Sequence, residues 1–199
     1  MLQTVDNLTT SPAAEQCFTL RGLTWHQFKT IQAGFEDVAN VGLFYCEGVL
    51  EIVGRGRLHE AIRCLMGLLM DQYFLQRRMV FFPSGTYSQI VENQVDYQAD
   101  LSYCFGTLKD VSDLCIEIII TSSSPIKLQK YRLMGVPEVW FWEDGTLELY
   151  HVREERYDHI TSSEVLPELD LSLLKRCILF ASPLDALEEF SRGMGDREN

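Results

Sequence analysis

The stretch Leu114-Cys115-Ile116-Glu117-Ile118-Ile119-Ile120 decides the fold class of this chain. Its density of β-branched residues is typical of a strand that is covered on both faces, in the middle of an α/β sheet. Glu117 places a carboxylate inside this apolar run. Because burying an unpaired carboxylate is costly, a metal ion, another cation or a proton should accompany it. Glu117 is therefore a candidate site residue; the alternative is a glutamate at the strand end, half in water or bridged to a lysine.

The residues around this strand predict a mixed α/β sheet with helices on its faces, not a repeated βαβ series. Helices are expected, from apolar periodicity, capping residues and proline, at 25–35, 58–74 and 125–134, with one or two more in the tail. Strands are expected at 41–46, 49–53, 79–82, 86–90, 99–105, 138–142 and 146–152. Tight turns are predicted at Glu47-Gly48 and Asp144-Gly145.

The chain length of 199 residues predicts one main domain. We expect a flexible segment over 1–20, the domain over 21–182, and a short helix and tail over 183–199. No stretch approaches the ~20 apolar residues that span a bilayer. The first residues lack the basic and hydrophobic regions of a secretory signal, so a cytoplasmic protein without membrane contact is expected.

The six cysteines contain no CxxC pair, and most fall inside apolar patterns. We expect them to be small core residues rather than disulfide partners or zinc ligands. The net charge of -12 argues against non-specific binding to nucleic acid. Any nucleic-acid site must therefore be a concentrated basic cleft.

The densest basic cluster of the chain comprises Arg55, Arg57, His59 and Arg63, at the entrance of a predicted helix. Arginines on a glycine-bearing loop beside a helix N-terminus could hold DNA phosphates. The alternative is a solvated loop with ordinary surface charge. Glu51 is a further acid inside an apolar strand, and either joins a metal site or lies at a strand edge.

Three residues could form a catalytic site together. Asp100 lies near the start of a predicted strand, Glu117 on a later strand, and Lys127 early in the helix that follows. Carboxylates on adjacent strands can chelate a hard cation such as Mg²⁺. A nearby lysine can orient a metal-bound water or stabilise charge developing on a phosphate.

Four segments resemble a known family: 47–52 followed by His59, Ala99-Asp100, Ile116-Glu117-Ile118, and the run from Lys127 to Trp140. They are similar to the restriction-endonuclease family abundant in cyanobacteria, within the PD-(D/E)xK nuclease superfamily. The similarity covers roughly residues 22 to 175, and the run from Lys127 to Trp140 is its most specific part. The resemblance implies a restriction-endonuclease-like fold, a mixed β-sheet flanked by helices.

The resemblance also assigns roles to individual residues. Asp100 and Glu117 match the two acidic metal ligands, for Mg²⁺ or Mn²⁺. The usual lysine two residues after the second acid is replaced by Ile119, and Lys127 on the next helix takes its place. Lys130 is a second candidate lysine that could contact the substrate. Ala99 stands where the motif has proline, which removes no ligand.

The expected function is that of a metal-dependent endonuclease that hydrolyses DNA phosphodiester bonds. Asp100, Glu117 and Lys127 would be catalytic, and Arg55, Arg57, His59 and Lys130 would contact the substrate. His59 could equally cap its helix or form a core hydrogen bond. Double-strand cleavage would favour a homodimer. The alternatives are an inactive nucleic-acid-binding or regulatory protein with the same fold, and an interaction module in which Glu117 only pairs with Lys127.

Overall fold

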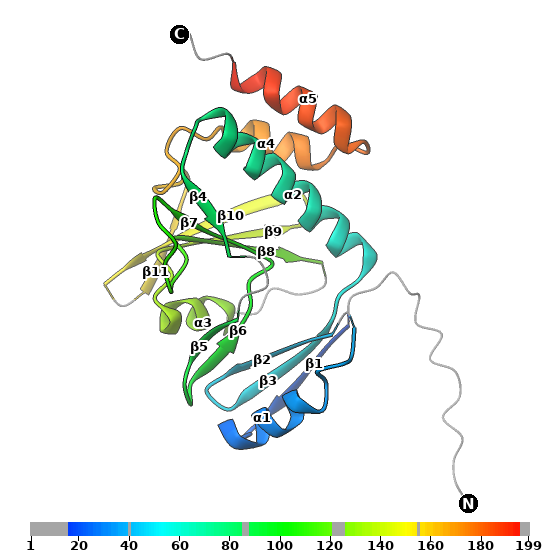
Figure 1. Cartoon of the computed structure of the whole chain (residues 1–199), viewed down its shortest axis with the longest axis vertical. Helices are drawn as coiled ribbons and strands as arrows, with labels where there is room; N and C mark the ends of the chain where they lie inside the picture. Colours follow the sequence, from blue (N-terminus) through cyan, green and yellow to red (C-terminus); the bar gives the residue numbers. More distant parts are fainter. Residues whose placement is uncertain (1–15, 40, 85–87, 121–125, 155, 196–199) are drawn as a thin grey trace, which may run out of the picture.

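The computed structural model describes residues 16–39, 41–84, 88–120, 126–154 and 156–195. Within them the chain forms two β-sheets and five helices (Figure 1). The sequence predicted one mixed sheet, so the second sheet is a correction. In sheet order, the five-stranded sheet contains β1 (Gln16–Arg21), β3 (Val49–Gly54), β2 (Val41–Cys46), β6 (Val95–Tyr97) and β5 (Gln89–Val91). All of its neighbouring strands are antiparallel.

The six-stranded sheet is the mixed sheet that the sequence predicted. In sheet order, its strands are β11 (Arg156–Ile160), β10 (Thr146–Arg153), β9 (Glu138–Glu143), β8 (Leu114–Ile119), β7 (Leu101–Phe105) and β4 (Phe81–Pro83). The pair β8–β9 is parallel, and the other pairs are antiparallel. All six residues of β8 are buried, which confirms that the strand with Glu117 is covered on both faces.

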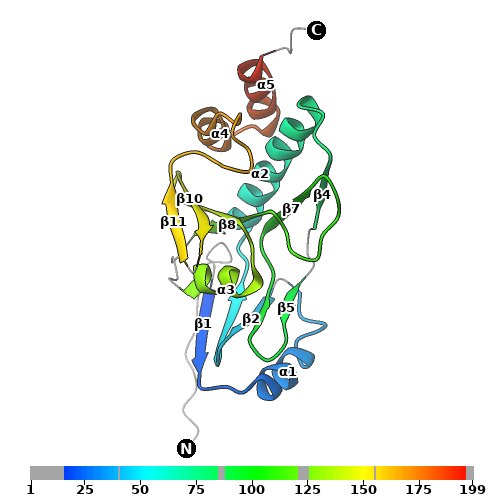
Figure 2. The same ribbon diagram turned by 90° about the vertical axis from the view of Figure 1, so that its left-hand side faces the viewer.

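Helices cover both sheets. One face of the six-stranded sheet packs against α2 (Arg57–Gln76), α4 (Leu171–Ile178) and α5 (Pro183–Met194). The other face packs against α3 (Ile126–Met134), which lies between the two sheets (Figure 2). The helix α1 (Trp25–Ala33) covers the far side of the five-stranded sheet. The site is built where α3 meets both sheets.

Most predicted elements are confirmed. Thr24 caps α1 through a capping box with Gln27. The hairpin turn at Asp144-Gly145 has positive φ at both residues, 45° and 80°, as a tight two-residue turn requires. Ser182 caps α5, and Ala186 and Phe190 of this helix are buried in the main core, so α5 packs on the domain.

Three strands were not predicted. β1 occupies residues 16–21, where a loose segment was expected; residues 1–15 lie outside the described residues. β6 is only three residues long, and β11 is a polar edge strand. Cys17 and Cys64 are exposed, which corrects their assignment to the core, whereas the other four cysteines are buried; all six are free. No helix in the described ranges is long and apolar enough to cross a membrane.

Candidate active site

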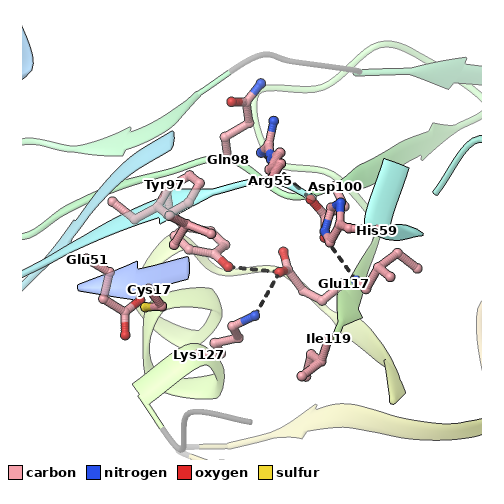
Figure 3. Close-up of a pocket in the computed structure, with 13 residues that line it drawn as sticks. Cys17, Glu51, Arg55, His59, Tyr97, Gln98, Asp100, Glu117, Ile119 and Lys127 are labelled. Carbon is pink, nitrogen blue, oxygen red and sulfur yellow. Dashed lines mark hydrogen bonds and ion pairs between the residues drawn. The ribbon is translucent and has the colours of Figure 1, made fainter. Parts of the chain in front are cut away.

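The two candidate acids face each other across neighbouring strands. The antiparallel register of β7 and β8 pairs Leu101 with Ile116. Continued by one residue, the same register places Asp100 opposite Glu117. Both side chains line one pocket, which lies beside α3 (Figure 3). The structure therefore brings together the two acids that the sequence predicted to share a site.

Asp100 is held by cationic and backbone donors. Its Oδ2 accepts a hydrogen bond from the backbone N–H of Ile118 at 2.9 Å and lies 3.1 Å from His59 Nε2. The guanidinium of Arg55 approaches the other oxygen at 3.7 Å. Burial acts to raise the pKa of Asp100, but the contacts with His59, Ile118 and Arg55 outweigh it and hold the pKa below its ordinary value. Asp100 is therefore an ionised carboxylate at neutral pH.

Glu117 is in a different environment, with only 3% of its surface exposed. Its Oε2 accepts hydrogen bonds from the hydroxyl of Tyr97 at 2.9 Å and from Lys127 Nζ at 3.4 Å (Figure 3). Its Oε1 accepts a hydrogen bond from the hydroxyl of Tyr131. Burial raises the pKa of Glu117, and the negative charge of Asp100 raises it further; Lys127 and the two phenols offset only part of this.

Lys127 and Tyr131 lie on consecutive turns of α3 and point at the same carboxylate. The side chain of Lys127 is 17% exposed, so its ammonium can reach both Glu117 and a ligand in the pocket. The sequence analysis assigned Lys127 to the site but not Tyr131. Burial raises the pKa of Tyr131 far above its usual value, which keeps its hydroxyl protonated as a donor.

Lys130 does not line the pocket. It is completely buried and forms an ion pair with Glu51 of β3, while its ammonium lies 4.5 Å from the centroid of the Tyr97 ring. Burial lowers the pKa of Lys130, and the charge of Glu51 opposes this effect. The predicted substrate contact of Lys130 is absent from this arrangement, because its position on α3 turns it toward the five-stranded sheet.

The predicted basic cluster divides between two hollows. Arg55 and His59 line the pocket with the acids. Arg57 and Arg63 line an adjoining groove that shares Arg55 and Asp100 with the pocket. Arg63 donates to Glu60 at 2.9 Å, so part of its charge is neutralised. The cluster therefore supplies one guanidinium to the pocket and two to its surroundings.

Comparisons with known proteins bear on the family and the fold of this chain. Residues 25–180 match the model of the Uma2 family, described as "putative restriction endonuclease". The chain belongs to this family. A solved structure, described as a putative nuclease of DUF820 from Anabaena variabilis ATCC 29413, is similar to this chain with a TM-score of 0.50 and 16% identity. The similarity covers 84% of this chain and 99% of that one. No curated protein gives a significant match.

The Uma2 match confirms the resemblance seen in the sequence, and the solved structure confirms the fold class. Sequence reasoning missed Tyr97 and the role of Tyr131. Tyr131 could have been found from its spacing, because it follows Lys127 by one helical turn. Tyr97 gave no such signal, since it lies on a three-residue strand of the other sheet. The site of this Uma2 chain thus combines residues from both sheets and α3.

The donor set of this Uma2 site fits a hard divalent cation. Within the described parts of the chain, no group of three or more His, Cys, Asp and Glu side chains is arranged to hold a metal ion. Three carboxylates line the pocket, and Glu51 pairs with Lys130, which leaves Asp100 and Glu117 as candidate ligands. Mg²⁺ is commonly bound by one or two carboxylates together with water. The charge of Asp100 raises the pKa of Glu117, and a cation between them would relieve that repulsion.

Proposed function

We propose that this Uma2 chain is a metal-dependent endonuclease that hydrolyses DNA phosphodiester bonds. The observation that carries the proposal is the convergence of Asp100, Glu117 and Lys127 in one pocket. Asp100 and Glu117 would hold Mg²⁺ or Mn²⁺. When bound, such an ion supplies a Lewis acid and lowers the pKa of its water.

The residues around the acids would prepare the site for phosphodiester hydrolysis. His59, Arg55 and the Ile118 N–H keep Asp100 ionised and oriented. The ammonium of Lys127 is placed to stabilise negative charge that develops on a phosphate. Arg55, and Arg57 and Arg63 in the adjoining groove, would contact neighbouring phosphates. Positive charge is thereby concentrated beside the pocket of a chain with net charge -12.

The first test measures metal binding by isothermal titration calorimetry with Mn²⁺ and Mg²⁺. The wild-type protein should bind one ion in the pocket, and Asp100→Asn should lose that binding. The control is Asp110→Asn, which removes the same charge from an exposed loop position. Absence of binding by the wild-type protein would contradict the metal-dependent proposal.

The second test measures cleavage of supercoiled plasmid with Mg²⁺ or Mn²⁺, and with EDTA as the metal-free control. Lys127→Ala should lower the cleavage rate by about 10²–10³-fold, the usual effect of removing one transition-state donor. Lys175→Ala, on α4 outside the pocket, should leave the rate unchanged. If the protein binds metal and DNA but does not cleave, the inactive nucleic-acid-binding alternative replaces the proposal.

We also propose that the active form is a homodimer, because cutting both strands of a duplex in one binding event favours two sites, one for each strand. Sedimentation equilibrium should give twice the chain mass of 22.9 kDa. The plasmid should then become linear without a long-lived nicked intermediate. A monomer that only nicks the plasmid would contradict the dimer and leave the nuclease proposal intact.

A further inference from the structure

The carboxylate of Glu117 is held at both oxygens by tyrosines from different parts of the fold. Tyr97 ends β6 in the five-stranded sheet and donates to Oε2 at 2.9 Å. Tyr131 lies on α3 and donates to Oε1. The two phenol rings are buried and meet edge to face, with centroids 5.4 Å apart. Neither hydroxyl can leave the carboxylate for bulk water without breaking the core.

The surroundings of the two rings are also fixed. The ring of Tyr97 packs against Phe44, with centroids 4.7 Å apart, and against the ammonium of Lys130 at 4.5 Å. Lys130 is tied in turn to Glu51. Tyr131 has no exposed surface. The two hydroxyls are therefore presented by rigid supports, one from each side of the carboxylate.

Holding both oxygens limits what Glu117 can do next. A carboxylate offers about four lone-pair directions. Tyr97, Tyr131 and Lys127 use three of them, so about one direction remains for another ligand. Because both oxygens are held, the carboxylate cannot rotate freely about its last torsion. Its remaining lone pair is thereby kept in one direction inside the pocket that Asp100 shares.

We propose that Tyr97 and Tyr131 are positioning residues, which orient the Glu117 carboxylate for binding a divalent cation. This inference rests on the proposed function. Neither tyrosine needs to touch the ion or the phosphate; both act through Glu117. The competing explanation is that the hydroxyls only satisfy a buried acid and stabilise the fold.

The two explanations differ in what Tyr97→Phe and Tyr131→Phe change. Each substitution removes one hydroxyl and keeps the ring. Loss of a hydrogen bond that orients a metal ligand typically weakens metal affinity about 10–100-fold. A purely stabilising hydroxyl lowers the melting temperature without changing the affinity of the folded protein. The matched control is Tyr45→Phe, which removes a buried hydroxyl that donates to the Leu23 carbonyl at 2.9 Å, outside the pocket.

The experiment measures Mn²⁺ affinity by calorimetry and the melting temperature of all four proteins without metal. We expect Tyr97→Phe and Tyr131→Phe each to weaken Mn²⁺ binding about tenfold or more. Tyr45→Phe should bind Mn²⁺ as the wild-type protein does, at a similar loss of melting temperature. In the plasmid assay the two pocket variants should need more Mn²⁺ for half-maximal rate.

The outcomes separate this inference from the proposed function. If the wild-type protein and both pocket variants bind Mn²⁺ equally, the positioning role is wrong and the nuclease proposal stands. If the wild-type protein binds no Mn²⁺, both are wrong. Each variant is measured separately, so failure of one to fold leaves the other to decide. A weakened affinity that Tyr45→Phe shares would also overturn the positioning role.

Discussion

Substitution of Glu138 by glutamine should destabilise the protein more than any exposed substitution. Glu138 begins β9, has no exposed surface and lies outside the pocket. Its two oxygens accept from five donors: Trp140 Nε1 at 2.7 Å, Ser163 Oγ at 2.6 Å, His151 Nδ1 at 3.1 Å, and the backbone N–H groups of Glu164 at 2.9 Å and Val165 at 3.3 Å. This carboxylate therefore ties β9 and β10 to the segment before α4.

The expected loss of unfolding free energy depends on how many of the five donors have no acceptor in the glutamine variant. An amide has one acceptor oxygen, and its NH₂ group would face the donors at the other oxygen. If the NH₂ replaces Oε2, the N–H groups of Glu164 and Val165 lose their acceptor, whereas His151 Nδ1 can accept from the NH₂ in the other tautomer of the ring. A buried unsatisfied donor costs about 1–3 kcal/mol, and these two hydrogen bonds are only partly buried, so we expect a loss in the lower part of the summed range, about 2–4 kcal/mol. In the flipped amide the NH₂ replaces Oε1 instead, and Trp140 Nε1 and Ser163 Oγ then lose their acceptor.

The assay is urea unfolding followed by circular dichroism, which yields the free energy of unfolding and the m-value. The control is Glu148→Gln, because Glu148 accepts from His159 at 2.6 Å but both side chains are about half exposed. That variant should change the free energy of unfolding by less than about 1 kcal/mol. Equal urea midpoints for the two variants would refute the reasoning that the five donors depend on the buried carboxylate.

Four further predictions concern melting temperatures. The pKa of Glu117 is raised above 4.5 by burial and by Asp100, so its charged form costs stability at neutral pH, and that cost is relieved as pH falls through the raised pKa. Without metal, we therefore expect Glu117→Gln to melt at a higher temperature than the wild-type protein at neutral pH, and this difference should shrink on acidification toward pH 4.5. A difference that stays constant with pH would contradict the raised pKa. Gly145→Ala should lower the melting temperature, since φ is +80° there and the strain is about 1–2 kcal/mol. Gly67→Ala, inside α2, would place its new Cβ 3.4 Å from a Leu101 methyl and should leave the melting temperature unchanged or raise it. Thr24→Ala should cost about 1 kcal/mol by removing the α1 cap, and an unchanged melting temperature would show that the cap does not matter.

The sequence predicted those parts of the fold that leave a local signal. The apolar run around Glu117 identified a buried strand, and the residues Asp144-Gly145 identified a tight turn, because each pattern acts within a few residues. The site residues Asp100 and Lys127 were proposed from their predicted positions on a strand and on a later helix, and the family resemblance then assigned their roles. Their meeting depends on the pairing of β7 with β8 and on the packing of α3, which no local pattern encodes.

The sequence analysis missed strands that depend on contacts with residues far away in the sequence. β6 contains Asp96, a residue that argues against a buried strand. Asp96 is nevertheless buried, because Lys29 of α1 binds its carboxylate at 2.6 Å and Gln32 donates to it at 3.2 Å. β1 has exposed Phe18 and Leu20, and among the described strands it is an edge strand that pairs with β3 alone. Such partners become visible only when the chain is folded.

Contacts between residues far apart in the sequence also assemble the site, and α3 makes such contacts with both sheets. Lys130 binds Glu51 in one sheet, whereas Lys127 and Tyr131 bind Glu117 in the other. Two lysines of one short helix thus each pair with a buried acid, one in each sheet. Neither acid could be buried without such a partner, because an uncompensated buried charge strongly destabilises the folded state. The sequence analysis predicted that Lys130 contacts the substrate. In the structure it instead links α3 to the five-stranded sheet through Glu51. Lys127 is 17% exposed and lines the pocket, whereas Lys130 is fully buried in its pair with Glu51, so the two lysines of α3 have different roles.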